Sequence, residues 1–220
     1  MKVRSKRAGS LLENYVMRIP TLEREVCEKI ITKIDQEKWE SDHSLYSYND
    51  IKDFNNEQTV DSKEKTPSID YTNFLTLRNA PTDNIIIEAL YSSIKKYVTE
   101  KGGEYFKGWQ GYTAIKYHKY GVGNFMAKHA DLMYIIGEED GEEELGLIDH
   151  PNKPFAGIPI LSIIGVLNDD YEGGEVEMFE NTKFDLQAGE VLIFPSVFLY
   201  PHKVCDVLKG TRYSFVSWVY

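Results

Sequence analysis

Apolar residues recur with a helical period in two segments of the first half of the chain. The pattern predicts helices over residues 21–38 and 83–101. Their apolar stripes are Val26, Ile30 and Ile34 in the first, and Ile87, Leu90, Ile94 and Tyr97 in the second. Thr21 is a candidate N-cap for the first helix. Between the helices, residues 41–70 are polar and predict a long loop, which could act as a lid.

From Gly111 onward the pattern changes to short β-rich runs separated by turn residues. We expect strands over residues 112–120, 127–135, 158–167, 174–179, 190–194, 204–208 and 212–219. Strands at this spacing predict a sandwich or barrel. The chain is therefore expected to be a single α+β domain over residues 1–220. Residues 1–110 would form a helical support region, and residues 111–220 a β core.

The amino-acid composition disfavours some classes of binding partner. The 220 residues carry a formal net charge of −10, which disfavours binding to nucleic acid. Residues 138–144 contribute six acidic side chains to it, whereas Lys2, Arg4, Lys6 and Arg7 make the N-terminus basic. The acidic segment is either a solvated loop or a site that favours a basic substrate. Without a long apolar run, neither a membrane span nor a secretion signal is expected. Two cysteines suit a reduced, cytoplasmic setting.

The candidate chemistry begins with His129 and Asp131, which are separated by one residue. If this stretch is a strand, both side chains project from one face. Alone, such a pair is more often structural than functional. His202 follows in the second half, and Arg212 lies ten residues after it. Two histidines and a carboxylate on a β scaffold are the ligand set of non-haem Fe(II) oxygenases. An arginine on an inward strand face can grip a carboxylate with its planar fork.

The ordered set of motifs resembles the 2-oxoglutarate/Fe(II)-dependent dioxygenases, and among them the prolyl 4-hydroxylase-like branch. The resemblance covers roughly residues 111–220. Besides His129, Asp131, His202 and Arg212, it rests on four segments: Tyr120 to Phe125, Leu167 to Glu175, Gly189 to Pro195, and Gly210 to Trp218. The chain departs from the branch at Val166, where a tyrosine is common. The resemblance implies a double-stranded β-helix (jelly-roll) core with N-terminal support helices.

The resemblance also implies the roles of individual residues. His129, Asp131 and His202 would bind Fe(II), and Arg212 would pair with the far carboxylate of 2-oxoglutarate. Tyr120 and Ser214 would assist, with Tyr117 as the alternative to Tyr120. Cosubstrates would be 2-oxoglutarate and O2, with ascorbate as a reductant and succinate and CO2 as co-products. The implied activity is hydroxylation of an amino-acid side chain, prolyl in a peptide or protein.

Other interpretations remain open at this point. The same chemistry could act on a free amino acid or small metabolite, or the chain could be a non-catalytic binding relative. Nucleic-acid demethylation is disfavoured because Trp218 stands where those relatives have a second arginine. His118 is expected on the outer surface of its strand, Trp218 in the core, and Gly174 in a turn without chemistry. The oligomeric state stays undetermined.

Overall fold

The computed structural model describes residues 9–42, 74–102, 106, 108–109, 111–131, 159–179 and 181–220. The basic residues up to Arg7, most of the predicted 41–70 loop and the acidic segment 138–144 lie outside this range. Within it, the predicted α+β class with a jelly-roll core is confirmed. None of the helices in these ranges is long and apolar enough to span a membrane.

The helices are α1 (Gly9–Leu12), α2 (Arg24–Ile34) and α3 (Asp83–Tyr97), with a 3-10 turn η1 (Glu13–Tyr15) and a π turn η3 (Val98–Gly102). The strands are β1 (Met17–Pro20), β2 (Glu40–Asp42), β3 (Phe74–Arg78), β4 (Lys116–Tyr120), β5 (Met126–His129), β6 (Leu161–Val166), β7 (Glu172–Gly173), β8 (Val176–Met178), β9 (Thr182–Phe184), β10 (Glu190–Pro195), β11 (His202–Val204), β12 (Val207–Lys209) and β13 (Arg212–Val219).

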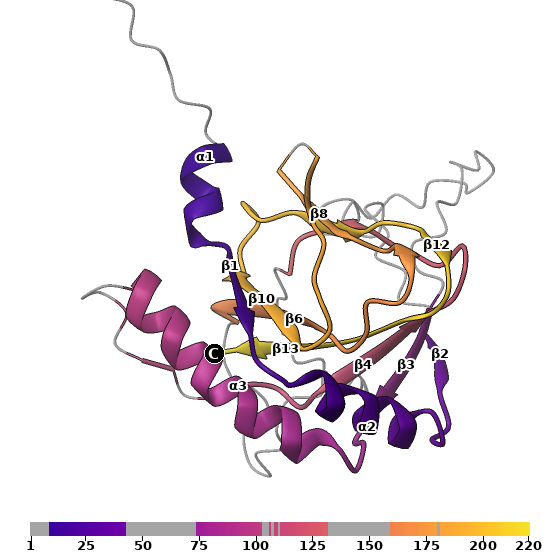
Figure 1. Cartoon of the computed structure of the whole chain (residues 1–220). Coiled ribbons are helices and arrows are strands. Elements are labelled where there is room, and N and C mark those ends of the chain that lie inside the picture. The colour runs from indigo at the N-terminus through magenta and orange to yellow at the C-terminus, as the bar shows by residue number, and fades with distance from the viewer. Residues whose placement is uncertain are drawn as a thin grey trace, which may run out of the picture.

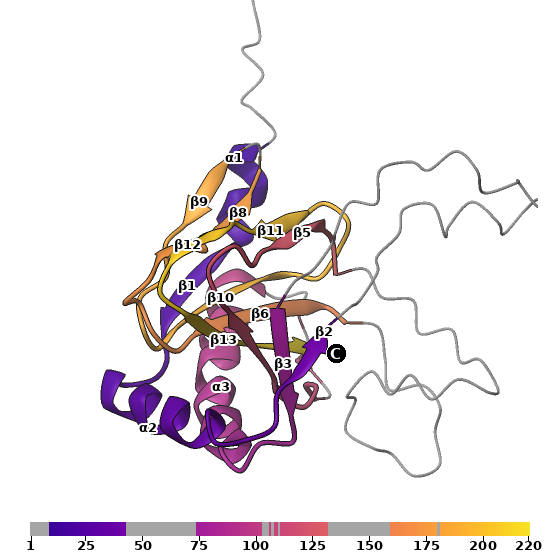
Figure 2. The same cartoon turned by 90° about the vertical axis from the view of Figure 1, so that its right-hand side faces the viewer.

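Two antiparallel sheets form the core. The larger has the strand order β1-β10-β6-β13-β4-β3-β2, and the smaller has the order β5-β11-β8-β9. A short pair, β12 and β7, lies beside them. Helices α2 and α3 cover one face of the larger sheet, and the smaller sheet lies over the other (Figures 1 and 2). The larger sheet is therefore the middle layer of the fold.

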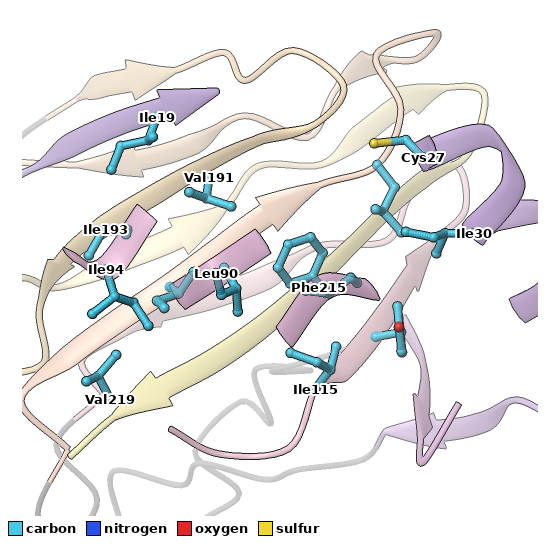
Figure 3. Packing of buried hydrophobic residues seen from close by; sticks show 14 of the residues in the cluster. Ile19, Cys27, Ile30, Leu90, Ile94, Ile115, Val191, Ile193, Phe215 and Val219 are labelled. Carbon is cyan, nitrogen blue, oxygen red and sulfur yellow. The ribbon is translucent and has the colours of Figure 1, made fainter. Parts of the chain in front are cut away.

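The helix layer is held by apolar packing against the larger sheet. The buried side chains of α2 are Cys27, Ile30 and Ile34, and those of α3 include Leu90 and Ile94. They meet Val191 and Ile193 from β10, together with Phe215 and Val219 from β13 (Figure 3). Because these side chains are almost fully removed from water, the hydrophobic effect fixes both helices to the sheet.

A second cluster fills the space between the sheets. Ile164 and Val166 of β6 and Leu192 and Phe194 of β10 meet Val176 and Met178 of β8. Neighbouring residues of one strand point to opposite faces. All six residues of β6 are buried because both faces of this strand are covered. Such a strand reads as a continuous apolar run instead of an alternating one.

Several predicted boundaries are wrong by a few residues. Helix α2 begins after Glu23, and the Thr21 hydroxyl does not cap it but donates to the Ile19 carbonyl. The π turn η3 continues α3 to Gly102. The predicted strand 204–208 is divided between β11 and β12, which belong to different sheets. The predicted strand 127–135 is described only to Asp131, and β5 ends before that residue.

Candidate metal centre and anion pocket

Two histidines meet across a pair of strands in the smaller sheet. His129 ends β5, His202 begins β11, and the two are direct cross-strand partners. Their ring centroids lie 4.4 Å apart. Asp131 follows β5, and the candidate ligand atoms of His129, Asp131 and His202 all lie within 4.8 Å of one another. The structure thus brings together three residues that span more than seventy positions of sequence.

Backbone hydrogen bonds orient both imidazoles. Nδ1 of His129 lies 2.8 Å from the Ala127 carbonyl, and Nδ1 of His202 lies 3.1 Å from the Tyr200 carbonyl. A carbonyl can only accept, so each Nδ1 carries the hydrogen and each Nε2 presents a lone pair. This arrangement is the usual way in which a protein fixes the tautomer of a metal-binding histidine. Both Nε2 atoms therefore face the Asp131 carboxylate.

The Asp131 carboxylate faces the Nε2 atoms of both rings. Its oxygens lie 3.4 Å from Nε2 of His129 and 3.8 Å from Nε2 of His202. Burial disfavours the ionised carboxyl, but the neighbouring His202 and His129 outweigh burial and lower the pKa of Asp131. For His129, burial is outweighed by Asp131 and the pKa is raised, whereas burial dominates at His202 and lowers its pKa.

The donor set fits a divalent transition metal. Two neutral imidazoles and one carboxylate supply three ligands, which leaves other coordination positions for a substrate or O2. An ionised carboxylate buried beside two imidazoles is costly without a cation. Among the described residues, this is the group of histidine, cysteine or acidic side chains with the geometry to hold a metal ion.

An anion pocket lies in the same cavity, on the face of the larger sheet. Arg212 begins β13 and is only 1% exposed. Its Nη1 donates to the Ser214 hydroxyl at 2.6 Å, while Nε and Nη2 have no hydrogen-bond partner among the described residues. No acidic side chain of the described residues pairs with this guanidinium. A buried cation with two unused donors fits a ligand carboxylate.

Strand pairing determines where the residues predicted to assist Arg212 lie. Tyr120 of β4 is the cross-strand partner of Arg212, and both line the cavity together with Ser214. Tyr117 points to the opposite face. It belongs to the core under the helices, and its hydroxyl lies 2.8 Å from that of Thr82. The structure therefore brings Tyr120 to Arg212 and keeps Tyr117 away from the cavity.

Three cavity residues were missed or misplaced by the sequence analysis. His118 was expected on the surface, but it is only 3% exposed and lines the cavity, so that expectation is wrong. Lys116, two residues earlier, lines the cavity as well. Strand alternation carried the signal, because residues 116, 118 and 120 share one face of β4. Trp218 was expected in the core, but it is only half-buried and lines the cavity, on the strand face that it shares with Arg212, so that expectation is wrong as well.

The comparisons with known proteins agree with this geometry. Residues 115–220 match the model of the 2OG-Fe(II) oxygenase superfamily. A PKHD-type hydroxylase of Synechococcus sp. (strain CC9311) is 38% identical over 85 residues, which are 36% of this chain and 38% of that protein. A second PKHD-type hydroxylase, from Prochlorococcus marinus (strain NATL1A), is 42% identical over 77 residues, which are 33% of this chain and 34% of that protein. The matched part thus spans little more than a third of these relatives.

Solved structures show the same fold over nearly the whole chain. A prolyl-4-hydroxylase from Pseudomonas putida has a TM-score of 0.56 at 14% identity, covering 93% of this chain and 91% of that one. A Trichoplax adhaerens prolyl hydroxylase, in complex with a peptide fragment of the hypoxia inducible factor oxygen degradation domain, has a TM-score of 0.59 at 13% identity. It covers 98% of this chain and 94% of that one.

Proposed function

Because the β core carries the sequence pattern and fold of the 2OG-Fe(II) oxygenase superfamily, with the prolyl 4-hydroxylase-like branch among its structural neighbours, we propose that this protein is an Fe(II)- and 2-oxoglutarate-dependent hydroxylase. Its substrate is a prolyl side chain in a peptide or protein, and its co-products are succinate and CO2. One observation carries the proposal: the three candidate metal ligands and the unpaired donors of buried Arg212 open into one cavity.

In this proposal each polar group has one task. His129 and His202, through Nε2, and Asp131, through its carboxylate, hold Fe(II). Arg212, Tyr120 and Ser214 hold the far carboxylate of 2-oxoglutarate. When bound, the metal and the cosubstrate supply the oxidising chemistry with O2 that amino-acid side chains lack, and ascorbate keeps the metal reduced.

Apart from Lys116 and His118, the remaining walls of the cavity are largely apolar. Met126, Val204, Ile164 and Val216 line the same cavity as the metal ligands, and apolar walls of this kind keep water away from a reacting centre. Support for a peptide substrate comes from the Trichoplax adhaerens enzyme, which has this fold and was solved with a peptide fragment. That resemblance is one of fold, and a panel of candidate substrates tests the choice of substrate directly.

Turnover of 2-oxoglutarate tests the proposal. Purified protein with Fe(II), ascorbate and 2-oxoglutarate should form succinate, and His129→Ala should abolish it. Cys205→Ser is the matched control, because the Cys205 thiol faces Glu177 and does not line the cavity. Succinate formation that persists in His129→Ala would refute the ligand assignment.

A panel of candidate substrates tests the proposal that the substrate is a prolyl side chain in a peptide. Peptides containing proline, lysine or asparagine are compared with the free amino acids, and mass spectrometry detects the gain of one oxygen atom. We expect the proline peptides to gain it. Oxygen gain confined to free amino acids would replace the peptide by a small-molecule substrate while leaving the oxygenase chemistry intact.

A further inference from the structure

His118 lies at the middle of β4, on the strand face that borders the cavity. Its cross-strand partners are Ser214 on β13 and Thr76 on β3. Ser214 is the residue that accepts from Nη1 of Arg212. On the other side of Ser214, the cross-strand partner is Val166, which has no polar atom to offer a ligand. A histidine in this row therefore adds a polar group to one side of the anion pocket.

His118 contacts Tyr120 directly, and both rings contact Phe74. Nδ1 of His118 lies 3.4 Å from the Tyr120 hydroxyl oxygen. The Phe74 ring lies 4.7 Å from the rings of both His118 and Tyr120. The guanidinium carbon of Arg212 lies 5.2 Å from the centre of the Tyr120 ring. The tyrosine ring is thus held by Phe74 and Arg212, and its hydroxyl end meets His118.

The single hydrogen of the Tyr120 hydroxyl determines how the bond with His118 affects ligand binding. A tyrosine hydroxyl carries one hydrogen, but its oxygen can also accept. If the hydroxyl donated to His118, it would have no hydrogen left for a carboxylate in the pocket. If Nδ1–H of His118 donates to the hydroxyl oxygen, the tyrosine hydrogen is directed away from the imidazole. Arg212 offers Nε and Nη2 to the same pocket.

Resting on the proposed function, we propose that His118 is a positioning residue for 2-oxoglutarate recognition. Its Nδ1–H donates to the hydroxyl oxygen of Tyr120, which fixes the hydroxyl hydrogen toward the carboxylate held by Arg212. His118 acts through Tyr120 and does not itself touch the ligand. The arrangement adds one oriented, uncharged donor to the charged donors of the arginine.

The test measures ligand binding, separately from turnover. Titration calorimetry on protein loaded with Mn(II) gives the affinity for 2-oxoglutarate and for 2-oxovalerate, in which a methyl group replaces the far carboxylate. His118→Leu removes the donor at similar volume. It should weaken 2-oxoglutarate binding about three- to tenfold and leave 2-oxovalerate binding unchanged. His118→Asn, whose amide can donate, should recover part of the loss. Thr76→Ala, on the neighbouring strand and outside the cavity lining, is the control.

A double-mutant cycle separates this role from a direct contact or a structural one. In a Tyr120→Phe background, His118→Leu should cost no further affinity for 2-oxoglutarate. Full additivity of the two substitutions would overturn the proposal, as would equal loss of both ligands. If His118→Leu does not fold, Tyr120→Phe alone still decides, because undiminished preference for 2-oxoglutarate in that variant overturns the proposal. A wild-type protein that does not prefer 2-oxoglutarate over 2-oxovalerate would instead refute the proposed function.

Discussion

Arg212 and Tyr120 are direct cross-strand partners, and the arginine guanidinium lies over the tyrosine ring at 5.2 Å from its centre. The ring and the Ser214 hydroxyl hold the charge in place on two sides. The remaining donors face a cavity that also contains the candidate metal ligands. A pre-oriented cation of this kind binds a carboxylate with little loss of conformational entropy in its own side chain.

Replacing Arg212 should abolish 2-oxoglutarate binding without lowering the free energy of unfolding. A buried charge without an ionic partner among the described residues costs free energy, so Arg212→Met should leave the free energy of unfolding unchanged or raise it by up to about 1 kcal/mol. We expect 2-oxoglutarate to raise the Tm of wild-type protein loaded with Mn(II), and this rise should be absent in Arg212→Met. Urea unfolding and thermal melts with and without 2-oxoglutarate measure both effects. A large loss of stability would instead show that the guanidinium is structural.

Tyr117 should behave in the opposite way. Tyr117→Phe removes the hydroxyl that lies 2.8 Å from that of buried Thr82, so the free energy of unfolding should fall by about 1 kcal/mol. The KM for 2-oxoglutarate should not change, because Tyr117 packs under the helices. Urea unfolding and steady-state kinetics are the measurements. An increase in KM without loss of stability would contradict the placement of Tyr117.

Gly174 has a packing role that its position in a turn did not suggest. Its φ is +65°, and an added Cβ would lie 2.8 Å from Cδ of Arg212. Gly174→Ala should therefore displace the arginine stem and raise the KM for 2-oxoglutarate. Gly123→Ala is the matched control, since its φ is +80° but no atom of the described residues beyond its chain neighbours lies within 4 Å of the added Cβ. Both variants pay the backbone cost of a left-handed conformation, about 1 kcal/mol. Equal effects on KM would rule out the contact with Arg212.

An ion pair on the opposite face of β4 predicts a pH dependence of stability. Asp35, at the end of α2, pairs with Lys119 and accepts from the Tyr213 hydroxyl at 2.9 Å. The bond from Lys119 outweighs burial and lowers the pKa of Asp35. The resulting stabilisation is fully present above the unfolded-state pKa of about 3.9 and is lost as the pH falls through the lower folded-state value.

Asp35→Ala should therefore lower the free energy of unfolding near neutral pH by no more than about 0.5 kcal/mol, because solvent screens this exposed pair. The difference between variant and wild type should shrink in acid. Urea unfolding at several pH values measures it. A difference that stays constant down to the acid range would show that Asp35 contributes by packing or helix capping instead of charge.

Much of the architecture follows from local pattern. The helical period of residues 83–101 and the β-rich runs after Gly111 predicted helix α3 and most strands of the core. The last strand, 212–219, was predicted at its observed bounds. Period-two alternation also placed Arg212, Ser214 and Trp218 on one face, and all three line the cavity. These features depend on residues close in sequence, where backbone geometry alone sets the relation between side chains.

The site itself depended on tertiary structure. Alternation separates Tyr117 from His118 but cannot say which of them faces the cavity, because Tyr117, His118 and Tyr120 are all buried by a layer on their own side of β4. That choice is made by α3 and the smaller sheet, which pack against opposite faces. Likewise, the pairing of β5 with β11 brings His129 to His202 across more than seventy residues. The sequence by itself determined the candidate metal ligands and Arg212, and which residues of one strand share a face. Only long-range pairing and the burial of both sheet faces decided which of them share one cavity, because those energies come from residues distant in the chain.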